Sequence, residues 1–220
     1  MEIKKTVVVW DWSIRLFHWL LVLLVSLLYI TGNYLFFPAH MYLGIAVMTL
    51  FFFRILIGFF GSQESKFISF IKHPSIVLNY IRGKYTHQGL GHNPIGGYSV
   101  LSFILIFLIM IISGLFCAVE DDYIYGPLSI FVSSEINDSF HSIHVVFSKI
   151  LLFAIALHVI AIFYYLFKKN NLIKPMITGK KSIDTIQQKI EQAPSVRLIF
   201  LLLLSLVYGM SCMYLFFIVL

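Results

Sequence analysis

Five long apolar stretches constrain the fold of this chain more than any other feature. They cover residues 13–37, 40–60, 97–119, 144–167 and 196–220. A helix needs about 20 consecutive apolar residues to cross the hydrocarbon core of a bilayer, and each stretch has roughly this length. The chain is 60% hydrophobic and only 12% charged, which is too apolar for a soluble domain. The sequence therefore predicts an all-α integral membrane protein with five transmembrane helices.

The positions of lysine and arginine predict the orientation of these helices. If the helices alternate in direction, fifteen of the sixteen basic residues lie on one side, in the N-terminal arm and in residues 54–84 and 168–197. Basic residues concentrate on the cytoplasmic side of membrane proteins, so we expect a cytoplasmic N-terminus and a C-terminus on the opposite side. The net charge of +6 thus reflects membrane topology and gives no support to nucleic-acid binding.

The outer loop between the third and fourth stretches is acidic. It has no lysine or arginine and carries five carboxylates, those of Glu120, Asp121, Asp122, Glu135 and Asp138. Such a loop could attract a basic partner protein through long-range electrostatics. A loop without cations is also what the topology alone produces, so both interpretations stay open.

Four histidines fall within the predicted helices, namely His18, His40, His144 and His158. An ionisable side chain in hydrocarbon is costly and usually has a partner or a function. In the predicted topology His18 and His158 lie toward the cytoplasmic side, whereas His40 and His144 lie toward the outer side. The last two in sequence are fourteen residues apart, which in a helix is a rise of about 21 Å and a rotation of only about 40°. One helix can therefore contribute a histidine to each of two layers.

The two layers suggest two bis-histidine metal centres, His18 with His158 and His40 with His144. Two axial imidazoles on one haem iron leave no open coordination position, which suits electron transfer. Structural zinc would require about four ligands per site. His141 competes with His144, but it lies about 100° from His158 around the helix and is therefore less well aligned. A single histidine at a helix end can also be a simple interfacial residue, and for His40 this alternative stays open.

Several motifs resemble the bacterial cytochrome b561 and nickel-iron hydrogenase b-type cytochrome family. Residues 9–19, V-W-D-W-S-I-R-L-F-H-W, are similar to the family's opening V-W-D-x-x-x-R-x-x-H-W. Residues 54–61 (R-I-L-I-G-F-F-G) resemble the end of its second helix, and residues 91–97 (G-H-N-P-I-G-G) resemble one of its loops. With His144, His158 and residues 176–180 (M-I-T-G-K), the resemblance covers about residues 7–181.

The resemblance implies a four-helix transmembrane bundle that binds two b haems through histidines of the first, second and fourth helices. We therefore expect a di-haem domain at residues 1–181, and a cytoplasmic connector with an additional transmembrane helix at residues 182–220. The family also implies the bacterial inner membrane, so the orientation predicted from the basic residues places the C-terminus in the periplasm. Its members pass electrons between a membrane quinone pool and redox proteins or subunits. The fifth helix departs from the family pattern, and oligomer formation through it is possible.

Other polar residues gain a possible role from this resemblance. Arg15 and Arg54 lie near the inner haem level and could pair with its propionates, although basic side chains at these depths also extend to the membrane surface. His92 and Asn93 are candidates for quinone binding or proton delivery, because histidine titrates near neutral pH. The alternative is structural, namely a glycine- and proline-rich loop in which Asn93 caps the third helix. Lys149 could neutralise a propionate of the outer haem, and the alternative is that its side chain extends past the helix end to the membrane surface.

The connecting segments give two further expectations. Residues 67–85 mix apolar and basic side chains, and an amphipathic helix on the cytoplasmic surface explains them best, with Pro74 and Ser75 suited to a helix start. Residues 170–193 are polar and form a connector that we expect to be partly helical.

The favoured function is a di-haem b-type cytochrome that transfers electrons between quinone and a periplasmic partner. That partner would be a cytochrome c, or a hydrogenase or dehydrogenase subunit. One alternative is a stand-alone quinone-linked oxidoreductase such as a superoxide oxidase. A second is a non-redox transporter or scaffold, which is less favoured because the stretches contain no midplane carboxylate and no evident pair of broken helices.

Overall fold

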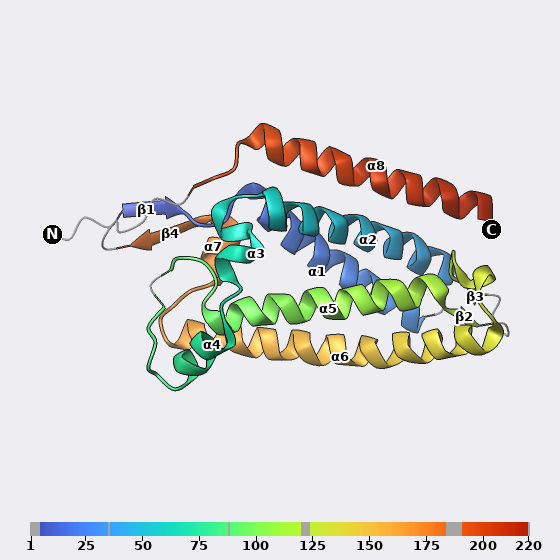
Figure 1. The fold of residues 1–220 in the computed structure, drawn as a ribbon, viewed down its shortest axis with the longest axis horizontal. Helices are drawn as coiled ribbons and strands as arrows, with labels where there is room; N and C mark the ends of the chain where they lie inside the picture. The colour runs from blue at the N-terminus through green and yellow to red at the C-terminus, as the bar shows by residue number, and fades with distance from the viewer. Residues whose placement is uncertain (1–4, 35, 88, 120–123, 184–190, 220) are drawn as a thin grey trace. The chain divides into compact units, whose positions relative to one another are not determined.

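The computed structural model describes residues 5–34, 36–87, 89–119, 124–183 and 191–219 (Figure 1). Five of its helices are long and apolar enough to cross a membrane: α1 (Trp12–Asn33), α2 (Phe37–Phe60), α5 (Pro94–Phe116), α6 (Ser134–Phe167) and α8 (Ser195–Val219). These helices satisfy their own backbone hydrogen bonds, as a lipid environment demands. The prediction of an all-α membrane protein with five spanning helices is confirmed.

The chain divides into two compact units, and the long helices contribute to both. The first unit comprises Met1–His18, Phe53–Ser102 and Leu157–Leu201, and the second comprises Trp19–Phe52, Phe103–Ala156 and Leu202–Leu220. Each histidine pair proposed from the sequence therefore falls within a single unit.

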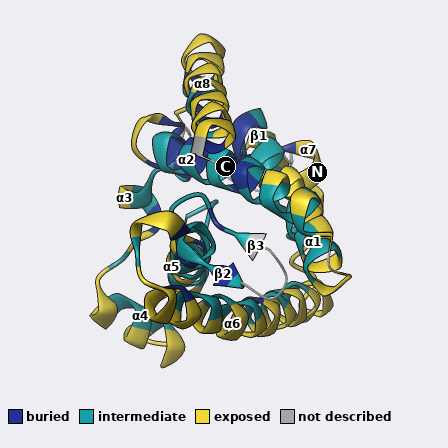
Figure 2. Cartoon of the chain, turned by 90° about the vertical axis from the view of Figure 1, so that its right-hand side faces the viewer, coloured by how far each residue is buried: buried dark blue, intermediate teal, exposed yellow. Residues whose placement is uncertain are grey.

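The core of the second unit joins four helices. Val47 of α2, Phe107 of α5 and Leu151 of α6 are buried together, and apolar residues of α1 such as Leu24 and Leu28 pack against them. Helix α8 packs on α2, with the rings of Tyr208 and Phe52 centred 4.5 Å apart. The remaining surface of α8 is largely exposed and apolar, as Figure 2 shows in yellow, and in a membrane protein such a surface contacts lipid. From Leu202 onward, the additional helix is thus a packed part of this unit.

Helix α6 begins earlier than the apolar pattern predicts. It starts at Ser134, ten residues before His144, so that Glu135 and Asp138 lie on the helix instead of in a loop. A carboxylate in the first turn is favoured by the helix dipole, which explains why a polar segment can extend the helix. Lys149 is exposed on the same helix. The other acidic residues of the predicted loop, Glu120, Asp121 and Asp122, lie outside the described residues.

The first unit has two short helices where the sequence suggested one amphipathic helix. These are α3 (Phe67–Phe70) and α4 (Pro74–Ile81). The chain is extended at His73, because a residue that precedes proline avoids the helical conformation. Phe70 is only 1% exposed, so this segment is partly a core element and not only a surface helix.

A small antiparallel ladder connects the N-terminal arm to the segment after α6. Strand β1 (Lys5–Val8) pairs with β4 (Lys180–Ile183), which follows the short helix α7 (Ile173–Thr178). Gly179 ends α7 with φ of 79°, a conformation that side chains other than glycine rarely adopt. The Gly179 carbonyl accepts hydrogen bonds from the backbone N–H groups of Val9 and Trp10, at 2.8 and 3.2 Å. The motif at residues 176–180 therefore anchors the entry to α1, where Asp11 caps the helix by accepting from the Ser13 N–H at 2.9 Å.

Candidate functional site

The second unit brings two histidines from different helices face to face. The ring centroids of His40 on α2 and His144 on α6 are 6.3 Å apart, with an interplanar angle of 76°. His141, the competing residue, is not a member of this pair.

The first unit contains a similar pair. The ring centroids of His18 on α1 and His158 on α6 are 6.5 Å apart, with an interplanar angle of 49°. Three helices thus bring together the same residues that the sequence pattern pairs.

Both separations fit a metal ion held between two imidazoles. Imidazole nitrogens bind metals at about 2.0–2.1 Å, and a five-membered ring with bonds of about 1.33 Å has its atoms about 1.1 Å from its centre. Two coaxial imidazoles on one metal therefore have centroids about 6.4 Å apart, and the observed values are 6.3 and 6.5 Å. Within the described part of the chain no group of three or more metal-binding side chains occurs, so each site offers two ligands. Two imidazoles per site would suit a haem, because the porphyrin provides four further nitrogen ligands to its iron.

The imidazole of His40 is oriented by helix α1. Its Nδ1 lies 3.0 Å from the carbonyl oxygen of Leu28 and 3.3 Å from Oγ1 of Thr31. A carbonyl can only accept a hydrogen bond, so Nδ1 must carry the proton. The lone pair is then on Nε2, where it is available to bind iron.

His144 is held in the same way by helix α5. Its Nδ1 lies 3.1 Å from the carbonyl oxygen of Met110 and 3.1 Å from Oγ of Ser113. Again the carbonyl requires a proton on Nδ1 and leaves the Nε2 lone pair for a metal.

A glycine follows the hydroxyl residue in each case and lets the helix approach the ring. A Cβ atom at Gly32 would lie 3.1 Å from Cε1 of His40, and one at Gly114 would lie 3.2 Å from Cε1 of His144. The sequence analysis missed these residues. The available signal was the short repeat of Ile-Thr-Gly at residues 30–32 and Ile-Ser-Gly at residues 112–114, each ending near the outer side of a spanning helix.

Arg54 is buried among aromatic rings and does not extend to the surface. It is only 3% exposed, and its guanidinium donates to the carbonyl oxygen of Ser65 at 3.3 Å. The guanidinium carbon lies 4.9 Å from the ring centre of Phe67, which is favourable cation–π geometry. Two further rings, those of Phe17 and Phe70, lie at 5.9 and 5.8 Å. The nearby carboxylate of Asp11 provides the opposite charge.

Arg15 connects α1 to α7. Its Nη1 donates to the Ile177 carbonyl at 2.7 Å, and its Nε donates to the Asp11 carbonyl at 3.3 Å. Both arginines thus have protein partners, and their pairing with haem propionates stays a prediction.

Asn93 has a structural role at the start of α5. Its Oδ1 accepts from the Gly96 N–H at 2.7 Å, which is an N-cap, and its Nδ2 donates to the Tyr165 hydroxyl at 2.7 Å. Pro94 at the first helical position has the φ angle that a helix requires. Asn93 therefore makes the contacts of a helix cap, which is the structural alternative considered from the sequence.

His92 lies between two aromatic rings, with centroid distances of 4.8 Å to Trp10 and 5.0 Å to Phe70. Burial, reinforced by the positive charge of Arg54, lowers the pKa of His92 to about 4. The imidazole is therefore neutral near pH 7, which is unfavourable for proton delivery. Its Nδ1 has no hydrogen-bond partner among the described residues.

Comparison with known proteins identifies one family. A family model described as prokaryotic cytochrome b561 matches residues 9–179, which include both histidine pairs. Comparisons with curated proteins and with solved structures gave no match.

Proposed function

Since the chain belongs to the prokaryotic cytochrome b561 family, we propose that each of its two histidine pairs holds one b-type haem through bis-histidine ligation. Family membership makes the protein a multi-pass membrane b-type cytochrome that acts in electron transfer. The observation that carries the proposal is the centroid separation of 6.5 Å in one pair and 6.3 Å in the other, close to the spacing of two imidazoles on one iron.

The protein residues position and tune the cofactor. A bound haem supplies one-electron redox chemistry. His18 with His158 and His40 with His144 would hold the two haem irons and keep substrate from binding to them. The carbonyls of Leu28 and Met110 keep the outer imidazoles in the tautomer that can act as ligand.

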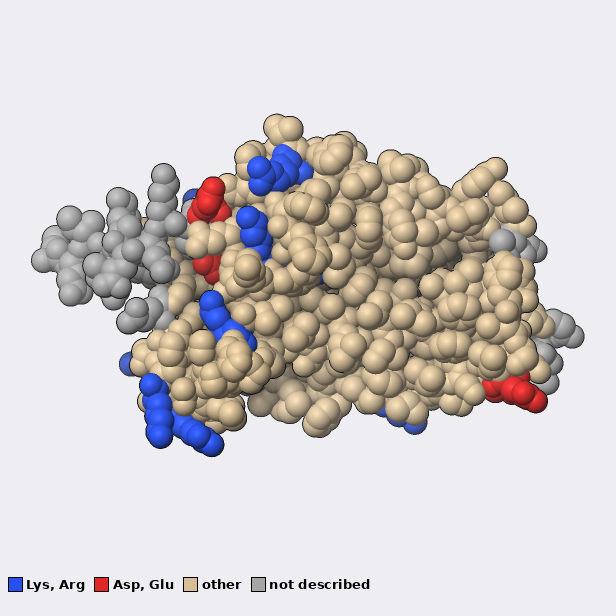
Figure 3. Space-filling view, in the orientation of Figure 1, with Lys and Arg blue, Asp and Glu red and all other residues tan. Residues whose placement is uncertain are grey.

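The electrons are proposed to move between the quinone pool and a periplasmic partner, a cytochrome c or a hydrogenase or dehydrogenase subunit. All basic residues except Lys149 belong to the first unit, and Figure 3 shows several of them on its surface. This supports a cytoplasmic location for the loops of the first unit, with the N-terminus in the cytoplasm and the C-terminus in the periplasm of a bacterial inner membrane. Glu135 and Asp138 belong to the second unit and would face a periplasmic partner.

His92 is the best candidate for a quinone contact. It is a neutral imidazole with a buried Nδ1 that has no hydrogen-bond partner among the described residues, so a quinone oxygen could be its partner. Asn93 would then hold the loop in place and would not bind quinone itself, because both ends of its amide contact the protein. Arg15 and Arg54 would balance the charge of the inner haem propionates.

The test is the number of haems per chain in the purified protein and its variants. We expect two haems in the wild type, and the loss of one in each of His18→Ala, His158→Ala, His40→Ala and His144→Ala. His141→Ala is the matched control, since it removes a neighbouring histidine of α6 and should retain both haems. A wild-type protein without haem absorbance, or a ligand variant with both haems, would contradict the assignment.

Co-purification distinguishes the conduit from a stand-alone oxidoreductase. A conduit should retain a periplasmic redox subunit on mild solubilisation, and the isolated chain should not turn over alone. A stand-alone enzyme such as a superoxide oxidase should reduce quinone without any other subunit.

A further inference from the structure

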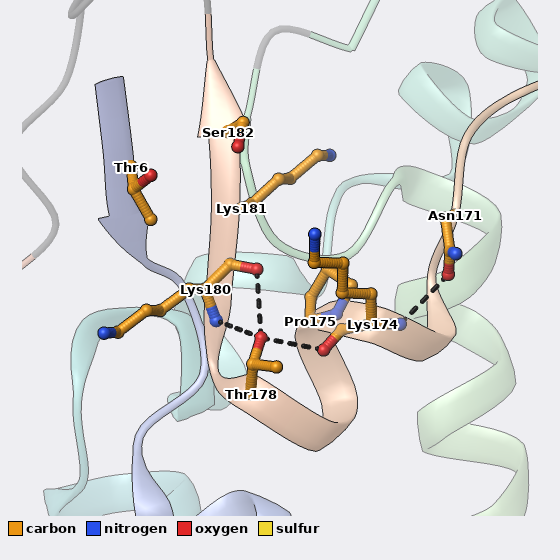
Figure 4. Close-up of a pocket in the computed structure, with 8 residues that line it drawn as sticks. All are labelled: Thr6, Asn171, Lys174, Pro175, Thr178, Lys180, Lys181 and Ser182. Carbon is orange, nitrogen blue, oxygen red and sulfur yellow. Dashed lines mark hydrogen bonds between the residues drawn. The ribbon is translucent and has the colours of Figure 1, made fainter. Parts of the chain in front are cut away.

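A cavity lined by lysine and hydroxyl side chains lies beside the segment that follows α6 (Figure 4). Its volume is about 380 Å³, and its walls come from β1, α7 and β4. Its lining residues are Thr6, Asn171, Lys174, Pro175, Thr178, Lys180, Lys181 and Ser182. Three of these eight residues are lysines and none is acidic, so the cavity is a positively charged one.

Hydrogen bonds from side chains to the backbone and one strand pairing hold the walls in a defined arrangement. Thr178 donates from Oγ1 to the Lys174 carbonyl at 2.9 Å and accepts from the Lys180 N–H at 3.2 Å. The side chain of Asn171 caps the start of α7 by accepting from the Lys174 N–H at 3.0 Å. Thr6 and Ser182 are directly paired across the β1–β4 ladder. The lysines are therefore spaced by a folded turn and not by a flexible tail.

Two of the lysines extend to the same side of β4. Figure 4 shows Lys174 and Lys181 on this side and Lys180 on the opposite side. The positive charge also acts on a neighbouring loop, because the pKa of His87 is lowered by burial and further by Lys72 and Lys181. A phosphate-bearing anion placed between Lys174 and Lys181 would relieve this repulsion.

The size and surroundings of the cavity favour a lipid headgroup over a soluble anion. The volume of 380 Å³ is more than ten times the roughly 30 Å³ that one water molecule occupies in the liquid, which leaves room for a phosphodiester and its glycerol. Apolar side chains lie in the adjacent sequence on both sides of Asn171. Phe167, the last residue of α6, is 85% exposed, and Ile177 on α7 is 57% exposed. Exposed apolar side chains near a membrane-spanning helix end are suited to contact acyl chains.

We propose that Lys174 and Lys181, with the hydroxyl and amide groups around them, bind the phosphate of an anionic phospholipid headgroup. The site assigns a function to the M-I-T-G-K motif at residues 176–180, whose glycine turn positions α7 against β4. The proposal does not depend on haem ligation, so the two can fail independently.

The experiment measures lipid retention by the full-length, haem-loaded protein in nanodiscs that contain phosphatidylglycerol and phosphatidylcholine. The test variant is Lys174→Gln with Lys181→Gln. The matched control is Lys168→Gln with Lys169→Gln, which removes the same charge closer to the end of α6. A lysine near an anionic membrane surface contributes about a fivefold gain in affinity, so we expect a loss of about 25-fold in phosphatidylglycerol affinity for the test variant. The control should lose much less.

Three results would overturn the proposal. Equal losses in the two double variants would mean that only the general positive surface attracts lipid. Unchanged lipid affinity in the test variant would remove the site. Displacement of the lipid by millimolar inorganic phosphate, with equal dependence on Lys174 and Lys181, would assign the cavity to a soluble anion. Haem content and thermal midpoint report whether each variant is folded. The single variant Lys181→Glu, at a partly exposed position, provides a second test, and its lipid retention must be lower than that of the wild type.

Discussion

Replacing Gly114 by valine should remove the outer haem without affecting the inner one. A Cβ atom at this position would lie 3.2 Å from Cε1 and 3.4 Å from Nδ1 of His144, so even alanine requires a shift of a few tenths of an ångström. Valine adds two methyl groups at the same place, and a packed core does not absorb them without displacing the ring. The displaced imidazole loses its hydrogen bonds to the Met110 carbonyl and the Ser113 hydroxyl, both now at 3.1 Å.

The size of the effect follows from the loss of these orienting contacts. Removing the partner that orients a metal-binding histidine typically reduces affinity by about 10- to 100-fold, or about 1.4–2.7 kcal/mol. We therefore expect the outer haem to be lost during purification, or to be retained with an altered potential, whereas the haem at His18 and His158 remains.

The assay combines haem content per chain with a redox titration followed by visible absorbance. Gly44→Val is the matched control, because it introduces the same β-branched residue into a spanning helix of the same unit and a Cβ there meets nothing within 4 Å. It should retain both haems. Two haems with unchanged potentials in Gly114→Val, or equal haem loss in Gly44→Val, would refute the argument.

Three further outcomes are expected. Ser113→Ala should weaken outer-haem binding by about 0.5–1.5 kcal/mol, which is less than Gly114→Val, because the Met110 carbonyl still orients His144. Haem retention under dilution measures the effect. A larger loss of haem than in Gly114→Val would contradict this expectation. Arg54→Leu should lower the thermal midpoint strongly, by the equivalent of about 3–5 kcal/mol, because it leaves the buried carboxylate of Asp11 without its positive neighbour. The control Arg82→Leu, at an exposed position, should have little effect on the thermal midpoint. The pKa of His92 is lowered to about 4 in the folded protein, so the unfolded chain binds more protons between pH 4 and 6.5 and stability should fall, by up to about 3 kcal/mol, as the pH decreases through this range. Thermal midpoints of His92→Gln should show a smaller decrease over the same range, and parallel curves for the two proteins would exclude this role.

The apolar pattern was sufficient to predict the five spanning helices. In lipid a chain segment must satisfy its own backbone hydrogen bonds, so an apolar run of about 20 residues has essentially one structure open to it. The pairing of His18 with His158 and of His40 with His144 also followed from the sequence, because the predicted topology gives each histidine a depth in the membrane. The spacing of fourteen residues then lets one helix contribute His144 to one layer and His158 to the other.

Other features depend on contacts between residues that are far apart in the chain, and only the folded structure shows them. The roles of Gly32 and Gly114 arise from the approach of one helix to a histidine on another, at 3.1 and 3.2 Å. The membrane depth predicted from the sequence allowed Arg54 either to extend to the surface or to be buried. In the fold it is buried, because the rings of Phe17, Phe67 and Phe70 surround its guanidinium. Likewise, residues 67–85 have the composition of one amphipathic helix, but the burial of Phe70 and the extended backbone before Pro74 divide them. The physical reason is that helix formation in a membrane is a local property of the chain, whereas the environment of a side chain depends on which other segments pack against it.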